Sequence, residues 1–192
     1  MSNAPMKRNI GRQIRAEAFS IPNILSYFRL LLIPLFIVLY VQEDFTEALI
    51  TLAASGLSDI LDGRIARKYD MVTDLGKVLD PVADKLTQCA MMICVAMRYP
   101  AMWWLLGLHV VKETVMLIMG WYVLKRTDTV NSAIWAGKLC TGVIYAVMML
   151  HVMLPHLPQP VSVGCTIVCA GLIVLSLIVY TARYVKILGG KK

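Results

Sequence analysis

Four aspartates stand at helical spacing in the stretch from Ser58 to Lys85, "SDILDGRIARKYDMVTDLGKVLDPVADK". Asp59 and Asp62 are three residues apart, and Asp80 and Asp84 are four apart. Each pair therefore lies on one face of a helix. Crowded carboxylates repel one another unless cations neutralise them, and oxygen ligands favour Mg²⁺, Mn²⁺ or Ca²⁺. The spacing predicts a divalent-cation site, and two such ions about 3.5–4 Å apart are typical of phosphoryl displacement.

Small residues accompany the aspartates on the same helical segments. Gly63 and Ala66 follow Asp62, and Gly76 lies one turn before Asp80. Residues of this size let a large group approach the helix backbone. The two segments are joined by a short polar turn around residues 68–73, so they run antiparallel and bring both sets of carboxylates to the same end of their helices.

The elements that position these aspartates are predicted from long apolar runs. The chain has 192 residues, of which 58% are hydrophobic and 16% charged, which is more apolar than a soluble domain. A helix needs about 20 mostly apolar residues to cross the hydrocarbon core. Six runs satisfy this requirement: Ile24–Val41, Thr46–Arg67, Leu75–Met97, Met102–Leu124, Ile134–Leu154 and Val161–Tyr184. The predicted fold class is all-α, a polytopic membrane protein with six transmembrane helices.

The distribution of positive charge predicts how these helices are oriented. The net charge of +7 is concentrated before the first run, around the second and fourth connections, and at the end of the chain. Basic connections stay on the cytoplasmic side, so both termini and the aspartate cluster should be cytoplasmic. This arrangement favours contact with anionic lipid of the cell inner (plasma) membrane over contact with nucleic acid.

The first 20 residues are predicted to form a basic juxtamembrane segment, and residues 21–192 a six-helix domain. Residues 7–19, "KRNIGRQIRAEAF", have the composition of a short basic surface helix. A disordered basic leader is the open alternative for this stretch.

The aspartate motif resembles the signature of the CDP-alcohol phosphatidyltransferases. Its eight matching identities are Asp59, Asp62, Gly63, Ala66, Arg67, Gly76, Asp80 and Asp84, with eight residues between Arg67 and Gly76. The stretch "PNILSYFR", from Pro22 to Arg29, resembles the entry of the family's first span. The stretch "LDPVADK" resembles the bacterial members that transfer to glycerol phosphate. Eight identities at fixed spacing are a specific signal.

The resemblance implies a role for each motif residue. Asp59, Asp62 and Asp80 would bind two Mg²⁺ (or Mn²⁺) ions, and Asp84 would contact one of them. Asp84 would also be the general base that takes the proton of the acceptor hydroxyl. The CDP moiety of CDP-diacylglycerol would contact Asp62, Gly63, Ala66, Arg67 and Gly76. The resemblance further implies a homodimer in the lipid bilayer, with the active site open to the cytoplasm.

The acceptor alcohol is less strongly indicated than the donor. The resemblance is greatest to phosphatidylglycerophosphate synthases, whose acceptor is glycerol 3-phosphate, and the candidate cations for its phosphate are Arg29, Lys112 and Lys138. These enzymes typically have Arg-Glu followed by Gly-Leu-Arg in the fourth span, and this chain has Lys112-Glu113 and lacks the arginine that follows. In the fifth span, Cys140 replaces the second lysine of their typical Gly-Lys-x-Lys-Thr. These departures keep open a cardiolipin synthase of the same family, which uses phosphatidylglycerol. Lys112 could instead form a structural ion pair with Glu113, and Lys138 could be an interfacial lysine.

Two other classes of protein remain alternatives at this stage. A cation channel or transporter could use carboxylates as an ion site. However, the aspartates gather at one end of a single helical hairpin rather than along a path through the membrane. A structural scaffold has no need of four clustered aspartates. Release of CMP distinguishes the enzyme from both alternatives.

Overall fold

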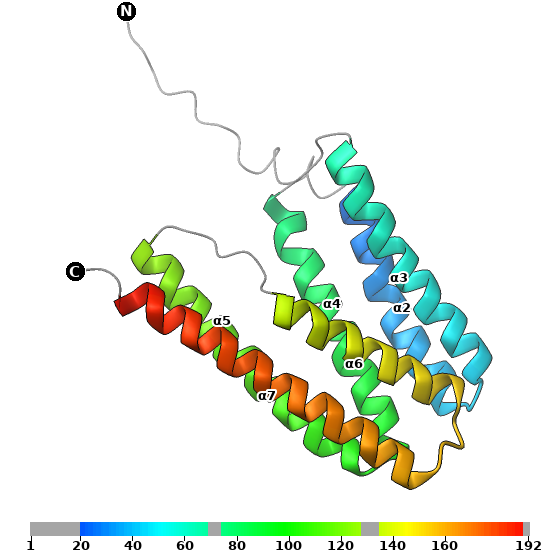
Figure 1. Ribbon diagram of the computed structural model, residues 1–192. Coiled ribbons are helices and arrows are strands. Elements are labelled where there is room, and N and C mark those ends of the chain that lie inside the picture. Colours follow the sequence, from blue (N-terminus) through cyan, green and yellow to red (C-terminus); the bar gives the residue numbers. More distant parts are fainter. Residues whose placement is uncertain (1–19, 69–73, 128–134, 190–192) are drawn as a thin grey trace, which may run out of the picture. The chain divides into compact units, whose positions relative to one another are not determined.

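The computed structural model describes residues 20–68, 74–127 and 135–189, which are helical apart from short turns. The helices are α2 (Ile21–Val41), α3 (Phe45–Lys68), α4 (Asp74–Arg98), α5 (Ala101–Thr127), α6 (Trp135–Met153) and α7 (Gln159–Gly189) (Figure 1). No strand occurs within these ranges, which confirms the all-α fold class. The stretch 7–19, with its predicted surface helix, lies outside the described residues.

Four of these helices are long and apolar enough to cross a bilayer. The spans are Asn23–Val41 in α2, Ala101–Val123 in α5, Trp135–Met153 in α6 and Gln159–Gly189 in α7. Helices α3 and α4, with 24 and 25 residues, are also long enough at about 1.5 Å per residue. They are less apolar because they carry the aspartates and basic residues of the motif. By length and composition the chain is an integral membrane protein, with four of the six predicted spans supported.

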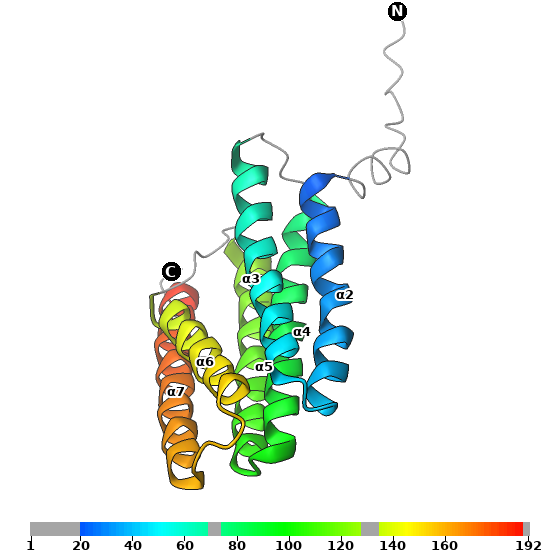
Figure 2. The same cartoon turned by 90° about the vertical axis from the view of Figure 1, so that its right-hand side faces the viewer.

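The chain forms two compact units, and the division between them falls within α4, after Gln88. In the first unit, α2 and α3 pack along each other as a hairpin (Figure 2). The turn between them has Glu43 in the left-handed region with φ of 67°, which is uncommon for a residue other than glycine. The Asp44 amide donates to the Leu39 carbonyl at 3.0 Å, which closes the end of α2 and reverses the chain.

Aromatic side chains fix the closed end of this hairpin. The rings of Phe36 and Tyr40 are both almost fully buried, with centroids 5.9 Å apart. Tyr40 also meets Phe45 of α3 edge to face at 5.4 Å. Buried aromatic pairs of this geometry add stability beyond their area. They set the register of α2 against α3, and so decide which α2 residues lie beside Asp59 near the other end.

In the second unit, α7 packs along both α5 and α6. Gly137 of α6 permits a close approach, because a Cβ atom there would lie 2.5 Å from the hydroxyl oxygen of Tyr180 in α7. The buried His151 joins the two helices at their other end, where its Nε2 lies 2.9 Å from the Ser162 hydroxyl. Its Nδ1 lies 2.7 Å from the Val147 carbonyl. Nδ1 therefore carries the proton, and Nε2 accepts from Ser162.

Candidate active site

The first half of the aspartate motif lies in the last turns of α3. The helix continues without a break to Lys68, so Asp59 and Asp62 keep their helical spacing. The side chain of Asp59 is 55% exposed, which leaves it accessible to a ligand. The roles predicted for Asp62, Gly63, Ala66 and Arg67 stay predictions, because these side chains lie outside the described residues.

The second half of the motif lies in the first turns of α4. Gly76 is buried, whereas Asp80 and Asp84 are half-buried. The helix runs through Pro81 without interruption, so these three positions remain at i, i+4 and i+8 on one face. The prediction that Asp80 and Asp84 share a helix face is therefore confirmed.

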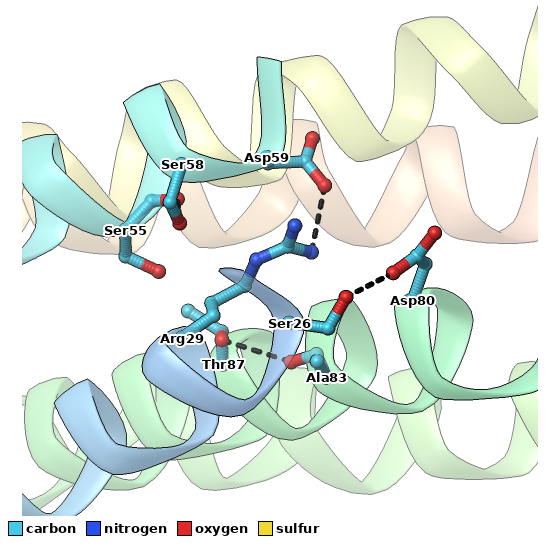
Figure 3. Close-up of polar contacts among 8 residues, drawn as sticks. All are labelled: Ser26, Arg29, Ser55, Ser58, Asp59, Asp80, Ala83 and Thr87. Carbon is cyan, nitrogen blue, oxygen red and sulfur yellow. Dashed lines mark hydrogen bonds and ion pairs between the residues drawn. The ribbon is translucent and has the colours of Figure 1, made fainter. Parts of the chain in front are cut away.

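Helix α2 supplies the basic partner of Asp59. A guanidinium nitrogen of Arg29 lies 2.6 Å from a carboxylate oxygen of Asp59, forming an ion pair between α2 and α3 (Figure 3). The Arg29 side chain is only 3% exposed. An ion buried to this extent requires an anionic partner, because desolvation without one costs several kcal/mol. The predicted contact of Arg29 with an acceptor phosphate stays a prediction.

The same helix supplies a hydrogen-bond donor to Asp80. The Ser26 hydroxyl lies 2.5 Å from a carboxylate oxygen of Asp80 and donates to it, which joins α2 to α4 (Figure 3). Ser26 is fully buried. A short hydrogen bond to a carboxylate is stronger than one between neutral groups, so it restricts the orientation of Asp80.

These contacts belong to a buried polar row on α2. Asn23, Ser26 and Arg29 follow at intervals of three residues, and none is more than 2% exposed. On a strongly apolar helix, such a row faces polar groups of neighbouring helices rather than lipid. Arg29 is among the site residues predicted from the sequence, whereas Asn23 and Ser26 are not, although their spacing within "PNILSYFR" is a visible signal. The site is thus built from α2, α3 and α4.

A further residue missed from the sequence is Gln88, one turn beyond Asp84 on α4. It is 1% exposed, and neither its amide nitrogen nor its amide oxygen has a hydrogen-bond partner in the described parts of the chain. Buried polar atoms are rarely left unpaired in native proteins. The signal in the sequence was its position at i+4 from Asp84 and i+8 from Asp80.

The two candidate lysines belong to the second unit. Lys112 of α5 is buried and lies 2.5 Å from the carboxylate of its neighbour Glu113, so the ion pair considered as an alternative role is present. Lys138 of α6 is exposed, as an interfacial lysine would be. Whether either lysine also contacts an acceptor stays a prediction.

The predicted divalent-cation site stays a prediction, and the described side chains supply only part of its ligand set. No three of their histidine, cysteine, aspartate or glutamate side chains are grouped so as to hold a metal ion, counting only the described residues. Asp62, which the motif adds to the set, lies outside them. Asp59 and Asp80 nevertheless offer carboxylate oxygens from α3 and α4, and Ser26 holds Asp80 in place. All-oxygen donors suit Mg²⁺ or Mn²⁺.

The chain is similar to known proteins over most of its length. The family model for CDP-alcohol phosphatidyltransferase matches residues 19–184. A probable phosphatidylglycerophosphate synthase of Mycobacterium tuberculosis is 31% identical over 185 residues, which cover 92% of this chain and 87% of that protein. A cardiolipin synthase (CMP-forming) of Streptomyces coelicolor is 33% identical over 141 residues, covering 70% of this chain and 66% of the relative.

A third relative is a fusion of cardiolipin synthase (CMP-forming) with a mitochondrial hydrolase, from Schizosaccharomyces pombe. It is 40% identical over 89 residues, which cover 46% of this chain but only 15% of the fusion protein. The match to the family model covers far more than half of the chain and includes every residue of the aspartate motif. The chain therefore belongs to the CDP-alcohol phosphatidyltransferase family.

Proposed function

We propose that this protein transfers the phosphatidyl group of CDP-diacylglycerol to glycerol 3-phosphate, releasing CMP and forming phosphatidylglycerophosphate. One observation carries this proposal: α2 contacts both halves of the aspartate motif. Arg29 pairs with Asp59 on α3, and Ser26 donates a hydrogen bond to Asp80 on α4. Membership of the family supports the donor class. The similarity to a probable phosphatidylglycerophosphate synthase over most of both chains supports the acceptor.

The metal requirement is part of the same proposal. Asp59, Asp62 and Asp80 would hold two Mg²⁺ or Mn²⁺ ions, with Asp84 touching one of them. When bound, such ions neutralise the pyrophosphate of the donor and stabilise the charge on the departing phosphate. The small side chains at Gly63, Ala66 and Gly76 would admit the CDP moiety, with Arg67 beside it.

The protein's own residues would move the proton. Asp84 accepts the proton of the acceptor hydroxyl, and the alkoxide oxygen forms a new bond to the β-phosphorus of the donor. The bond from that phosphorus to the bridging oxygen breaks, and CMP leaves with the bond's electron pair. Asp84 lies one turn beyond Asp80 on the same helix face, so it can adjoin the motif's ligands and still meet the acceptor.

Phosphatidylglycerol is the second candidate acceptor, which would make the enzyme a cardiolipin synthase. The Streptomyces relative carries that name. Lys112 is paired with Glu113, and Cys140 is a buried residue where a lysine is typical of the glycerophosphate enzymes. A neutral lipid hydroxyl would need fewer cations than a free phosphate. Arg29, Lys112 and Lys138 remain the proposed contacts for a phosphorylated acceptor.

The membrane arrangement extends the proposal. With α3 and α4, residues 21–192 would form a domain of six transmembrane helices, with residues 1–20 as a basic juxtamembrane segment. Both termini and the active site would face the cytoplasm across the inner (plasma) membrane, and the enzyme would be a homodimer. A cation channel or transporter is the alternative from a different class, and it would release no CMP.

An acceptor screen tests the function directly. The purified full chain is supplied with labelled CDP-diacylglycerol and Mg²⁺, together with glycerol 3-phosphate, phosphatidylglycerol, inositol phosphate or serine. We expect CMP release and labelled phosphatidylglycerophosphate with glycerol 3-phosphate only. Labelled cardiolipin with phosphatidylglycerol would assign the second acceptor. No CMP release with any acceptor, from protein that remains folded, would contradict a phosphatidyltransferase.

A further inference from the structure

The ion pair between Arg29 and Asp59 is very unequal in burial. The arginine side chain is 3% exposed, whereas the carboxylate is 55% exposed. Arg29 therefore depends on an anion beside it, because its position on α2 denies it water. Asp59 does not depend on Arg29 to the same degree, because solvent or another cation can reach it.

The same carboxylate is a proposed metal ligand. Its Oδ1 oxygen is 2.6 Å from the guanidinium nitrogen, at the distance of direct contact (Figure 3). A divalent cation at Asp59 would bring a second positive centre to a carboxylate that already pairs with Arg29. Two cations sharing one carboxylate repel each other strongly in surroundings of low dielectric constant. The guanidinium and the metal therefore compete for Asp59.

We propose that Arg29 is an exchangeable counter-ion: it yields Asp59 to a divalent cation and pairs instead with a phosphate oxyanion of a substrate. This inference rests on the proposed function and deepens it. The exchange keeps an anion beside the buried guanidinium at every stage. A phosphate suits the role because the planar guanidinium binds its oxygens in bidentate fashion. The phosphate belongs to either the donor pyrophosphate or the acceptor.

The neighbouring contacts favour a local exchange over a large movement. Ser26 lies one turn before Arg29 on α2 and is bonded to Asp80 of α4. Figure 3 shows the Arg29 side chain reaching from α2 toward Asp59, with Asp80 on the adjacent helix. Ser26 can therefore hold α2 and α4 together while the Arg29 side chain changes partner. Arg29 acts here as a positioning residue that couples metal binding to phosphate binding.

The competition predicts that removing Arg29 strengthens metal binding. Mn²⁺ binding to the full chain in detergent is measured by calorimetry for the wild type, Arg29→Met, Asp59→Asn and the double variant. We expect Arg29→Met to bind Mn²⁺ roughly tenfold more tightly than wild type. We expect no such gain when Arg29→Met is added to Asp59→Asn. Arg183→Met, which changes an arginine of α7 outside the site, is the matched control and should not alter affinity.

The exchange also predicts weaker phosphate binding in the same variant. Affinities for CMP and for glycerol 3-phosphate are measured with Mg²⁺ present. A loss in Arg29→Met confined to glycerol 3-phosphate supports the acceptor phosphate as the new partner, and a loss confined to CMP supports the donor phosphate. Arg29→Lys keeps the charge and should retain wild-type Mn²⁺ affinity, with part of the phosphate affinity. This variant also provides the test if Arg29→Met fails to fold.

The possible results distinguish a failure of the proposed exchange from a failure of the proposed function. A wild type that binds Mn²⁺ and releases CMP, with Arg29→Met no tighter for Mn²⁺, would overturn the exchange and leave the function intact. Unchanged affinity for both phosphates would overturn it equally. A wild type that releases CMP but binds no Mn²⁺ would overturn the exchange together with the metal site, while leaving phosphatidyl transfer standing.

Discussion

Ser26 and Asp80 are 54 residues apart in the chain, yet the Ser26 hydroxyl donates a 2.5 Å hydrogen bond to the Asp80 carboxylate. The donor is fully buried on α2, and the acceptor is half-buried on α4. The bond restricts the rotation of one of the two motif aspartates on α4. The bond links α2 to the second half of the aspartate motif on α4, so α2 contributes to the candidate active site.

Ser26→Ala should therefore impair turnover more than stability. Loss of one hydrogen bond to a carboxylate costs about 1.5–3 kcal/mol, and we expect a fall in kcat of roughly tenfold or more. Affinity for CDP-diacylglycerol should change little. Single-turnover CMP release measures the effect. Thr87→Val is the matched control, because the buried Thr87 hydroxyl donates to the Ala83 carbonyl of its own helix. A Ser26→Ala enzyme with wild-type kcat would contradict a positioning role.

Asp80→Asn should abolish activity, and removal of metal from the wild type should do so reversibly. Each change removes part of the proposed metal site, whose ions would stabilise the transition state by several kcal/mol, corresponding to about 10³-fold in rate. CMP release is measured before chelation, after chelation and after Mg²⁺ is restored. Asp44→Asn, at the far end of the α2–α3 hairpin, is a control that should remain active. Substantial metal-independent activity of Asp80→Asn would refute the two-metal mechanism.

Asp84→Asn should lose the chemical step while keeping much of its affinity for the donor. Loss of a general base typically lowers the rate by about 10²–10⁴-fold. Donor affinity in detergent is compared with single-turnover CMP release. Asp62→Asn is the reference variant, because Asp62 is proposed both to bind metal and to contact the CDP moiety, so its loss would weaken donor binding directly. If Asp84→Asn loses donor affinity as completely as Asp62→Asn, then Asp84 is chiefly a metal ligand.

Gln88→Met should stabilise the protein. The change removes two buried polar atoms that lack partners among the described residues, at nearly constant side-chain volume. Each such atom carries a desolvation cost of about 1–3 kcal/mol, so the melting temperature should rise. Thermal unfolding in detergent provides the measurement. Met91→Leu, a volume-conserving change at a buried apolar position on the same helix, is the control. A lower melting temperature for Gln88→Met would show that the amide is satisfied in the native protein.

The orientation of the chain predicts which connections reach the cell exterior. A cysteine introduced at Glu43 or Gln159 should react with an impermeant probe in intact cells, because these connections lack basic residues. A cysteine at Met71 or Thr127 should react only after the membrane is permeabilised, which also serves as the control for reactivity. External labelling at Met71 would place the aspartate motif on the wrong side of the membrane.

The sequence alone determined the helices and the faces of the motif. Apolar runs predict the helices within a few residues, because a helix in lipid must satisfy its own backbone groups and so requires a long apolar segment. The sharing of a face by Asp80 and Asp84 is local, since it depends only on the 3.6-residue period. Whether α3 and α4 cross the membrane is harder to predict, because the charged residues of the motif make these two helices less apolar.

Only the tertiary structure decided which side chains of α2 contact the aspartates of α3 and α4. Arg29 and Asp59 are separated by 30 positions in the chain, and no local pattern says that α2 turns its polar row toward α3 and α4. That register depends on the packing of Phe36, Tyr40 and Phe45 at the closed end of the hairpin. Contacts between helices arise from the fit of whole surfaces, and a helical period read along one segment carries no information about its neighbours.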